Sequence, residues 1–217
     1  MIEEKIAISK KKILEFCLLV EEMIDGSISG LLNKNREILK KIIEEYEVKA
    51  NNFEIEIDEI CIETIAQFEP KAKNLRTILM ILKINNDLER IGDHAVNISE
   101  SALFLIEKPQ VKPLIDIPRM AEKTIEMVKL SINAFINEDV SLARKVCSND
   151  DIVDNLRDQI MRELITYMIS DSHTIERSLH LLRISQNLER IADLSTNISE
   201  DVIYMVEGKI IKHHFEE

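Results

Sequence analysis

Carboxylates recur at a spacing of four residues in segments whose apolar residues follow the helical period. Glu54 and Asp58 form one such pair, and Glu89 and Asp93 form another. At about 100° per residue, a spacing of four places both side chains on one face of a helix. Like charges at that spacing destabilise a helix by roughly 0.2–0.5 kcal/mol. A cation is therefore expected over these faces, and oxygen ligands suit Mg²⁺, Mn²⁺, Ca²⁺ or iron.

The segment that contains Glu89 occurs twice in the chain. The string LERIGD at 88–93 corresponds to LERIAD at 188–193, and NISE at 97–100 recurs at 197–200, an offset of 100 residues. A weaker repeat places Asp150 and Asp154 at 96 residues after Glu54 and Asp58. If the helices that carry these pairs lie antiparallel and adjacent, each half of the chain could gather four oxygen-rich side chains around one site.

A second interpretation of these faces is a structural network of ion pairs. Its cations would be Lys83, Arg90, Arg183 and Arg190. No Glu-x-x-His motif of a redox di-iron site is present, and no nucleophile stands beside a base. His94 is expected to be a packed or exposed histidine, and His173, His180, His213 and His214 are expected at the surface. The sequence therefore offers no support for catalysis.

The elements that must position these carboxylates are long helices. Only 4 glycines and 4 prolines occur in 217 residues, and 4% of residues are aromatic, which disfavours a sheet protein. The expected segments are a helix from near the start to Leu31, a short piece at 36–46, helices at 47–68 and 70–108 with Pro70 in the first turn of the second, then 120–135, a short piece at 139–146, 149–169 and 172–207. The chain is thus predicted to be all-α, a tandem repeat of two three-helix bundles packed side by side, with residues 1–108, a proline-bearing linker at 109–118, and residues 119–217.

The charge and composition of the chain disfavour several classes of partner and some cellular locations. The formal net charge is -12, which disfavours nucleic acid and anionic lipid as partners. No apolar run approaches the ~20 residues that span a bilayer, and the first residues lack the basic and apolar pattern of a signal peptide. We expect a cytoplasmic protein without membrane insertion, whose three cysteines, Cys17, Cys61 and Cys147, are reduced.

The string LERIGDHAVNI at 88–98 resembles the signature of the PhoU family of phosphate-transport regulators. The string VIYMVEGK at 202–209, with His213, resembles the ending of the family, and the resemblance covers essentially the whole chain. It implies a PhoU-like pair of three-helix bundles in which acidic motifs from adjacent helices bind metal ions. Carried onto this chain, the ligands are Glu54, Asp58, Glu89 and Asp93 in the first half, and Asp150, Asp154, Glu189 and Asp193 in the second. The metal would be a divalent or trivalent ion, namely iron, manganese, magnesium or zinc.

The resemblance also implies a role without catalysis. Family members are cytoplasmic negative regulators that restrain phosphate uptake and the phosphate-starvation response, as adaptors between the ATPase subunit of the phosphate ABC transporter and a phosphate-sensing histidine kinase. The second motif departs from the family pattern, because Ala192 replaces the usual glycine and Leu194 the usual histidine. The long amphipathic helices could also support a homodimer. Two alternatives stay open, a helical scaffold or dimerisation module without metal and a carboxylate-bundle metalloenzyme.

Overall fold

The computed structural model describes residues 1–208, and every regular element in that range is helical. The first half contains α1 (Ile2–Asn33), α2 (Arg36–Lys41), a π-helical turn (Ile42–Tyr46), α3 (Glu47–Phe68) and α4 (Ala72–Ile106), and the second half contains α5 (Asp116–Asn137), α6 (Val140–Ser170), a 3₁₀ turn (Ser172–Thr174) and α7 (Ile175–Glu207). Predictions for Lys209, His213 and His214 lie outside the described residues.

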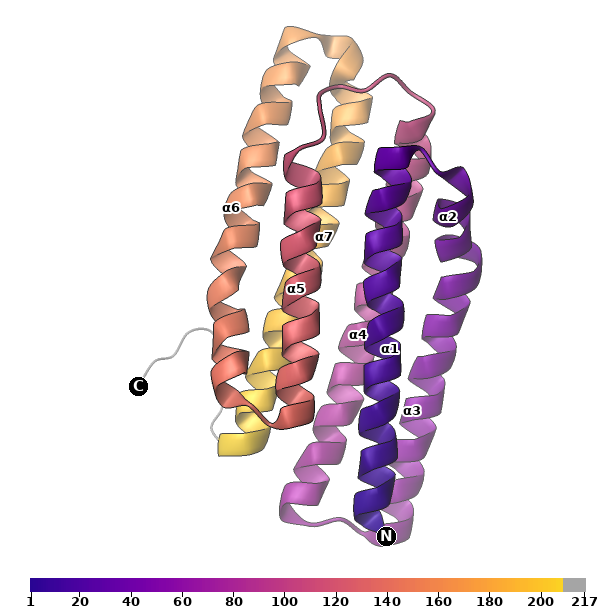
Figure 1. Cartoon of the computed structure of the whole chain (residues 1–217), viewed down its shortest axis with the longest axis vertical. Coiled ribbons are helices and arrows are strands. Elements are labelled where there is room, and N and C mark those ends of the chain that lie inside the picture. Colours follow the sequence, from indigo (N-terminus) through magenta and orange to yellow (C-terminus); the bar gives the residue numbers. More distant parts are fainter. Residues whose placement is uncertain (209–217) are drawn as a thin grey trace.

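The helices form two bundles that lie side by side (Figure 1). One bundle consists of α1, α3 and α4, with α2 at one end, and the other consists of α5, α6 and α7. The bundles meet along two seams, where α4 packs on α7 and α1 packs on α5. The predicted all-α fold with two three-helix repeats is therefore confirmed.

Each long helix buries a stripe of apolar residues at the helical period. On α4 the stripe includes Ile84, Leu88 and Ile91, none of which has any exposed surface. Their counterparts one hundred residues later, including Leu188 and Ile191, are equally buried on α7. Because residues three and four apart share one face of a helix, this burial turns the opposite stripe, which carries the acidic motif, toward solvent.

Two predicted breaks between helices are absent. The helical backbone runs from Arg36 to Phe68 without interruption, and the π-helical turn at 42–46 joins α2 to α3. Likewise α6 is a single helix from Val140 to Ser170, where the sequence was expected to give a short piece and a separate helix. Neither segment contains a proline or glycine that could end a helix. The two predictions of short separate pieces were therefore wrong.

The connections also differ in detail from expectation. Glu69 closes α3 in the left-handed conformation, with φ 44, and Pro70 lies in the connection rather than in the first turn of α4. Gly30 permits the return of the chain after α1, because a Cβ at this position would lie 2.6 Å from Leu39 Cδ2. The connection between the bundles covers residues 107–115, and Pro118 belongs to the first turn of α5.

None of the helices within residues 1–208 carries an apolar stretch sufficient to cross a membrane.

Candidate metal centre

The first-half carboxylate cluster combines side chains from two packed helices. α3 carries Glu54 and Asp58, and α4 carries Glu89 and Asp93. Burial raises the pKa of Glu54 above its ordinary value, and the charges of Asp58 and Asp93 raise it further. Burial likewise raises the pKa of Glu89, with added contributions from Asp93 and Glu54. The acids of α3 and those of α4 therefore act on one another electrostatically.

Neutral groups support this first cluster. Asn85 is fully buried, and its Nδ2 donates to Asp58 Oδ1 at 2.9 Å and to the Glu54 carbonyl oxygen at 2.8 Å. Within residues 1–208, none of the four carboxylates forms an ion pair with lysine or arginine. Asn85 therefore stabilises Asp58 by a neutral hydrogen bond. The charge of Arg90 lowers the pKa of Glu89 without outweighing burial.

The second-half cluster has the same four positions on α6 and α7. Asp150 and Asp154 lie on α6, and Glu189 and Asp193 lie on α7. Burial raises the pKa of Asp150 to about 6, with further contributions from Asp193 and Asp154. Burial is also the largest cause of the raised pKa values of Glu189 and Asp193. The second set of predicted residues is therefore brought together as well.

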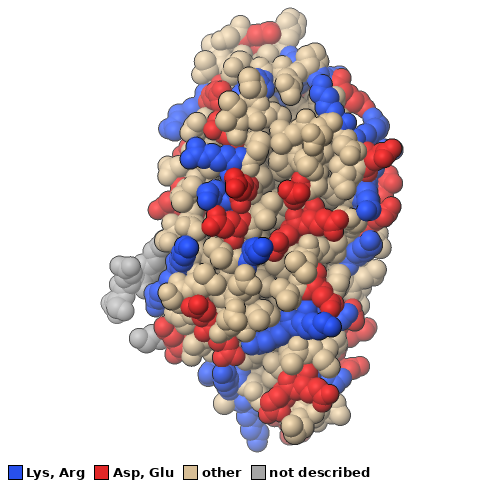
Figure 2. Space-filling view, viewed as in Figure 1, with Lys and Arg blue, Asp and Glu red and all other residues tan. Residues whose placement is uncertain are grey.

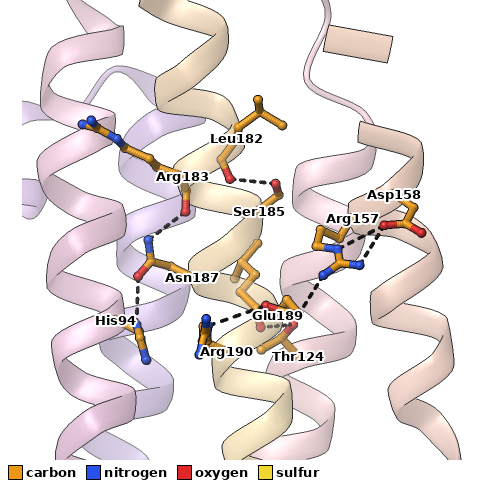
Figure 3. Close-up of polar contacts among 11 residues, drawn as sticks. His94, Thr124, Arg157, Asp158, Leu182, Arg183, Ser185, Asn187, Glu189 and Arg190 are labelled. Carbon is orange, nitrogen blue, oxygen red and sulfur yellow. Dashed lines mark hydrogen bonds and ion pairs between the residues drawn. The ribbon is translucent and has the colours of Figure 1, made fainter. Parts of the chain in front are cut away.

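An arginine lies within the second cluster, and the sequence interpretation missed it. Arg157 Nη1 donates to Glu189 Oε1 at 2.9 Å, and Arg157 Nη2 donates to Asp158 Oδ1 at 2.8 Å (Figure 3). The guanidinium charge lowers the pKa values of Glu189 and Asp193, although burial outweighs it. The 96-residue offset that relates Asp150 to Glu54 aligns Arg157 with Cys61. That alignment was the available signal that the two clusters differ in charge.

The predicted network of ion pairs is only partly present around these clusters. Lys83 pairs with Asp201, and Arg90 lies 3.6 Å from Asp87, so both cations bind acids outside the candidate set. Arg190 Nε is 4.0 Å from Glu189 Oε2. The Arg183 backbone carbonyl oxygen accepts from Asn187 Nδ2, and burial together with the Arg183 charge lowers the pKa of His180, so this cation also acts outside the candidate set. The network interpretation therefore fits the second cluster better than the first.

The described histidines differ in how far they are buried. His94 Nδ1 lies 2.8 Å from Asn187 Oδ1 across the α4–α7 seam, which fits a packed histidine (Figure 3). His173 is exposed, as expected. The prediction of a surface position for His180 was wrong, because its ring is half-buried and stacks on Phe104 with centroids 4.0 Å apart. The sequence could not reveal this contact, since it depends on the packing of α4 against α7.

The chemistry of the donors fits a hard cation in the first half. Burial and the neighbouring acids raise the pKa values of Glu54 and Glu89, and none of the four carboxylates is ion-paired within residues 1–208, so a metal ion that neutralised them would be stabilising. In the second half the guanidinium of Arg157 already supplies positive charge. Across residues 1–208, no three His, Cys, Asp or Glu side chains stand in an arrangement that could hold an ion. Metal binding would therefore require the carboxylates to adopt other rotamers.

The fold and the repeated acidic motif define a class, a tandem pair of three-helix bundles with one carboxylate cluster in each half. The PhoU domain matches residues 13–102 and 117–202, one match in each bundle. The chain therefore belongs to the PhoU family, as its motifs suggested.

The chain is similar to known PhoU proteins over most of its length and most of theirs. The phosphate-specific transport system accessory protein PhoU homolog of Aquifex aeolicus is 41% identical over 205 residues, which cover 94% of this chain and 92% of the relative. The accessory protein PhoU of Escherichia coli (strain K12) is 33% identical over 195 residues, covering 90% and 80%. The crystal structure of PhoU from Pseudomonas aeruginosa superimposes with a TM-score of 0.92 at 31% identity, covering 96% of this chain and 100% of that one. The family is one of accessory proteins and not of enzymes, which confirms the prediction that this chain is not an enzyme.

Proposed function

We propose that this chain is a cytoplasmic negative regulator of phosphate uptake and of the phosphate-starvation response. The observation that carries the proposal is the extent of the family likeness, because relatives named as accessory proteins of phosphate-specific transport match both bundles at 33–41% identity. The two-bundle fold supports it, since long helices display extended faces on which partners can bind.

The proposed partners are the ATPase subunit of a phosphate ABC transporter and a phosphate-sensing histidine kinase. The chain would act as an adaptor that binds both. Figure 2 shows acidic and basic side chains interspersed over the face that carries α1 and α5. Combined with a net charge of -12, such a surface favours basic patches on partners and long-range electrostatic steering toward them.

Metal binding at the first-half cluster is a further part of the proposal. Glu54 and Asp58 from α3 and Glu89 and Asp93 from α4 would hold a hard divalent or trivalent cation such as Mn²⁺ or iron. The ion would neutralise the four carboxylates and tie the two helices together. Binding at 100 times the Kd would stabilise the folded chain by about 2.7 kcal/mol.

Deletion and complementation in the source cell test the proposed function. Phosphate uptake and a phosphate-starvation reporter are measured in phosphate-rich medium, with and without the gene for this chain. Both signals should rise on deletion and fall when the wild-type gene is restored. If neither changes, the regulatory role is wrong and a scaffold or dimerisation module becomes the better account.

The same strains separate regulation from metal binding. A strain restored with Glu89→Ala plus Asp93→Ala should regulate less well than one restored with the wild type, provided that both proteins accumulate equally. Full regulation by the double variant would show that the metal is dispensable for the adaptor role.

A further inference from the structure

We propose that Arg157 is a built-in counter-ion that closes the second-half carboxylate cluster to metal, so that the two halves differ in what neutralises their acids. The inference rests on the proposed metal binding of the family motif and assigns a different cation to each half. In the first half the cation would come from solution, and in the second it belongs to the chain.

Arg157 forms an ion pair with Glu189, one of the predicted metal ligands. Its side chain leaves α6 one turn after Asp154 and reaches α7, where it donates to Glu189 Oε1 at 2.9 Å. The Glu189 side chain is 18% exposed and that of Arg157 is 33% exposed, so the pair is partly withdrawn from solvent. Asp158 holds the other side of the guanidinium through Nε and Nη2. A charge-assisted bond of this kind occupies one of the two Glu189 oxygens that could bind a metal, and it neutralises the charge that would attract one.

The first half has neutral residues at the corresponding places. Cys61 occupies the position of Arg157 under the 96-residue offset, and its thiol is buried, with 1% exposure. Asn85 occupies the position of Ser185 under the 100-residue offset, and it donates to Asp58. The carboxylates are therefore the same in both halves, and the groups that face them differ in charge.

A metal ion that entered the second cluster would face two costs. It would have to displace the guanidinium from Glu189, and it would then lie close to a second positive charge at a partly buried site. The first cost is absent in the first half, where no lysine or arginine within residues 1–208 pairs with Glu54, Asp58, Glu89 or Asp93. The second is smaller there, because Arg90, whose charge acts on Glu89, pairs with Asp87 instead. Arg157 thus bridges α6 and α7 from within the second cluster.

Mn²⁺ binding to the purified full chain tests the assignment. Arg157→Met removes the charge and keeps most of the stem, and Arg162→Met on the same helix is the matched control, since Arg162 is exposed and contacts Thr166 only through its backbone carbonyl. By equilibrium dialysis, Arg157→Met should bind more Mn²⁺ per chain than the wild type, and Arg162→Met should not. The added metal should be lost again when Glu189→Ala and Asp193→Ala are combined with Arg157→Met. Equal binding by Arg157→Met and the wild type would overturn the proposal.

Failure of the proposed metal function gives a different pattern. If the wild type binds no Mn²⁺, the first-half site is wrong, whereas a gain in Arg157→Met still supports the counter-ion. If the wild type already loses metal on Glu189→Ala plus Asp193→Ala, the second cluster binds metal with Arg157 in place and the inference is wrong.

A measurement without metal gives a second, independent test. Thermal unfolding in chelator is followed by circular dichroism for the wild type, Arg157→Met, Glu189→Gln and the double variant, which also shows whether each protein folds. The two single changes should be non-additive, because each removes the same charge–charge interaction between Arg157 and Glu189. Additive shifts in Tm would mean that Arg157 and Glu189 do not interact in solution.

Discussion

The two carboxylate clusters have the same origin in sequence and different surroundings in structure. Each cluster consists of an acidic pair on one helix and an acidic pair on the next helix of the same bundle. In both bundles the repeated motif lies on a helix whose opposite face is a buried apolar stripe. In the first cluster Asn85 supplies a neutral hydrogen bond, and in the second Arg157 supplies a charged one. Retention of ligand-type residues is therefore not sufficient to predict a metal site, because the residues that face the ligands decide whether a cation is needed.

The buried apolar residues of the repeated motif should be equivalent in the two halves, so they provide a reference for this comparison. Leu88 and Leu188 are both fully buried at matching positions. Replacing either by Ala should cost about 2–5 kcal/mol in the free energy of unfolding, through lost transfer free energy and a cavity. Chemical denaturation of the two variants measures these values. A large loss at one position and almost none at the other would show that the halves are not equivalent even in their cores.

Asp87 breaks the symmetry of the seam, because its counterpart is Asn187. Burial raises the pKa of Asp87 to about 6, with Asp201 adding to the shift and Arg90 and Lys83 opposing it. The folded state therefore holds a proton that the unfolded chain releases near pH 4, so the contribution of Asp87 to stability falls as the pH rises from about 4 to 6. Asp87→Asn should stabilise the metal-free protein by roughly 1–3 kcal/mol above pH 6 and lose that gain near pH 4.

Denaturation of this variant and the wild type across pH 4–8 is the measurement. Asn is the chosen replacement because the second half carries Asn187 at the matching position. A gain of the same size at every pH would contradict the titration of Asp87.

Gly92 and Ala192 differ inside the motif itself. A Cβ at Gly92 would lie 3.5 Å from Ala50 Cβ and 3.6 Å from Met23 Cε, which is ordinary contact distance. Gly92→Ala should therefore be accommodated and should stabilise α4 by up to about 1 kcal/mol, since Ala is the better helix former. The shift in Tm measures the effect. A loss of stability would mean that α1 and α3 pack more tightly against α4 than these distances indicate.

The smallest expected effect compares the two motif glutamates in chelator. Glu89→Gln should raise stability by a few tenths of a kcal/mol, because it relieves repulsion from Asp93 and Glu54. Glu189→Gln should give less, since it also weakens the bond from Arg157. Paired thermal scans at pH 7 are the measurement. A larger gain at Glu189 than at Glu89 would contradict the contrast between the clusters.

Much of the fold follows from the sequence because its signals are local and repeated. The scarcity of breakers and the apolar period predicted long helices, and the duplicated motif at 88–93 and 188–193 predicted two bundles. The breaks expected near Tyr46 and Val146 were wrong, because neither place has a proline or glycine that would end a helix. The backbone continues through a π-helical turn at the first place and through α6 at the second. The gathering of each carboxylate set was predictable from a spacing of four on adjacent helices.

Other features depend on contacts between distant segments. Arg157 was missed because its importance comes from Glu189, which lies 32 residues away on another helix. The stacking of His180 on Phe104 crosses the seam between the bundles and has no counterpart in any local pattern. Motifs thus indicated where the acids gather, and only the packing of the helices revealed which cation faces them.

The most direct test is a count of Mn²⁺ bound per chain for three proteins side by side: the wild type, Glu89→Ala plus Asp93→Ala, and Glu189→Ala plus Asp193→Ala. Each double variant removes the two α4 or α7 carboxylates of one cluster, so each is the control for the other. The account predicts that the first double variant loses the bound metal and that the second retains the wild-type amount. Loss of metal in the second variant alone, or an equal loss in both, would contradict it.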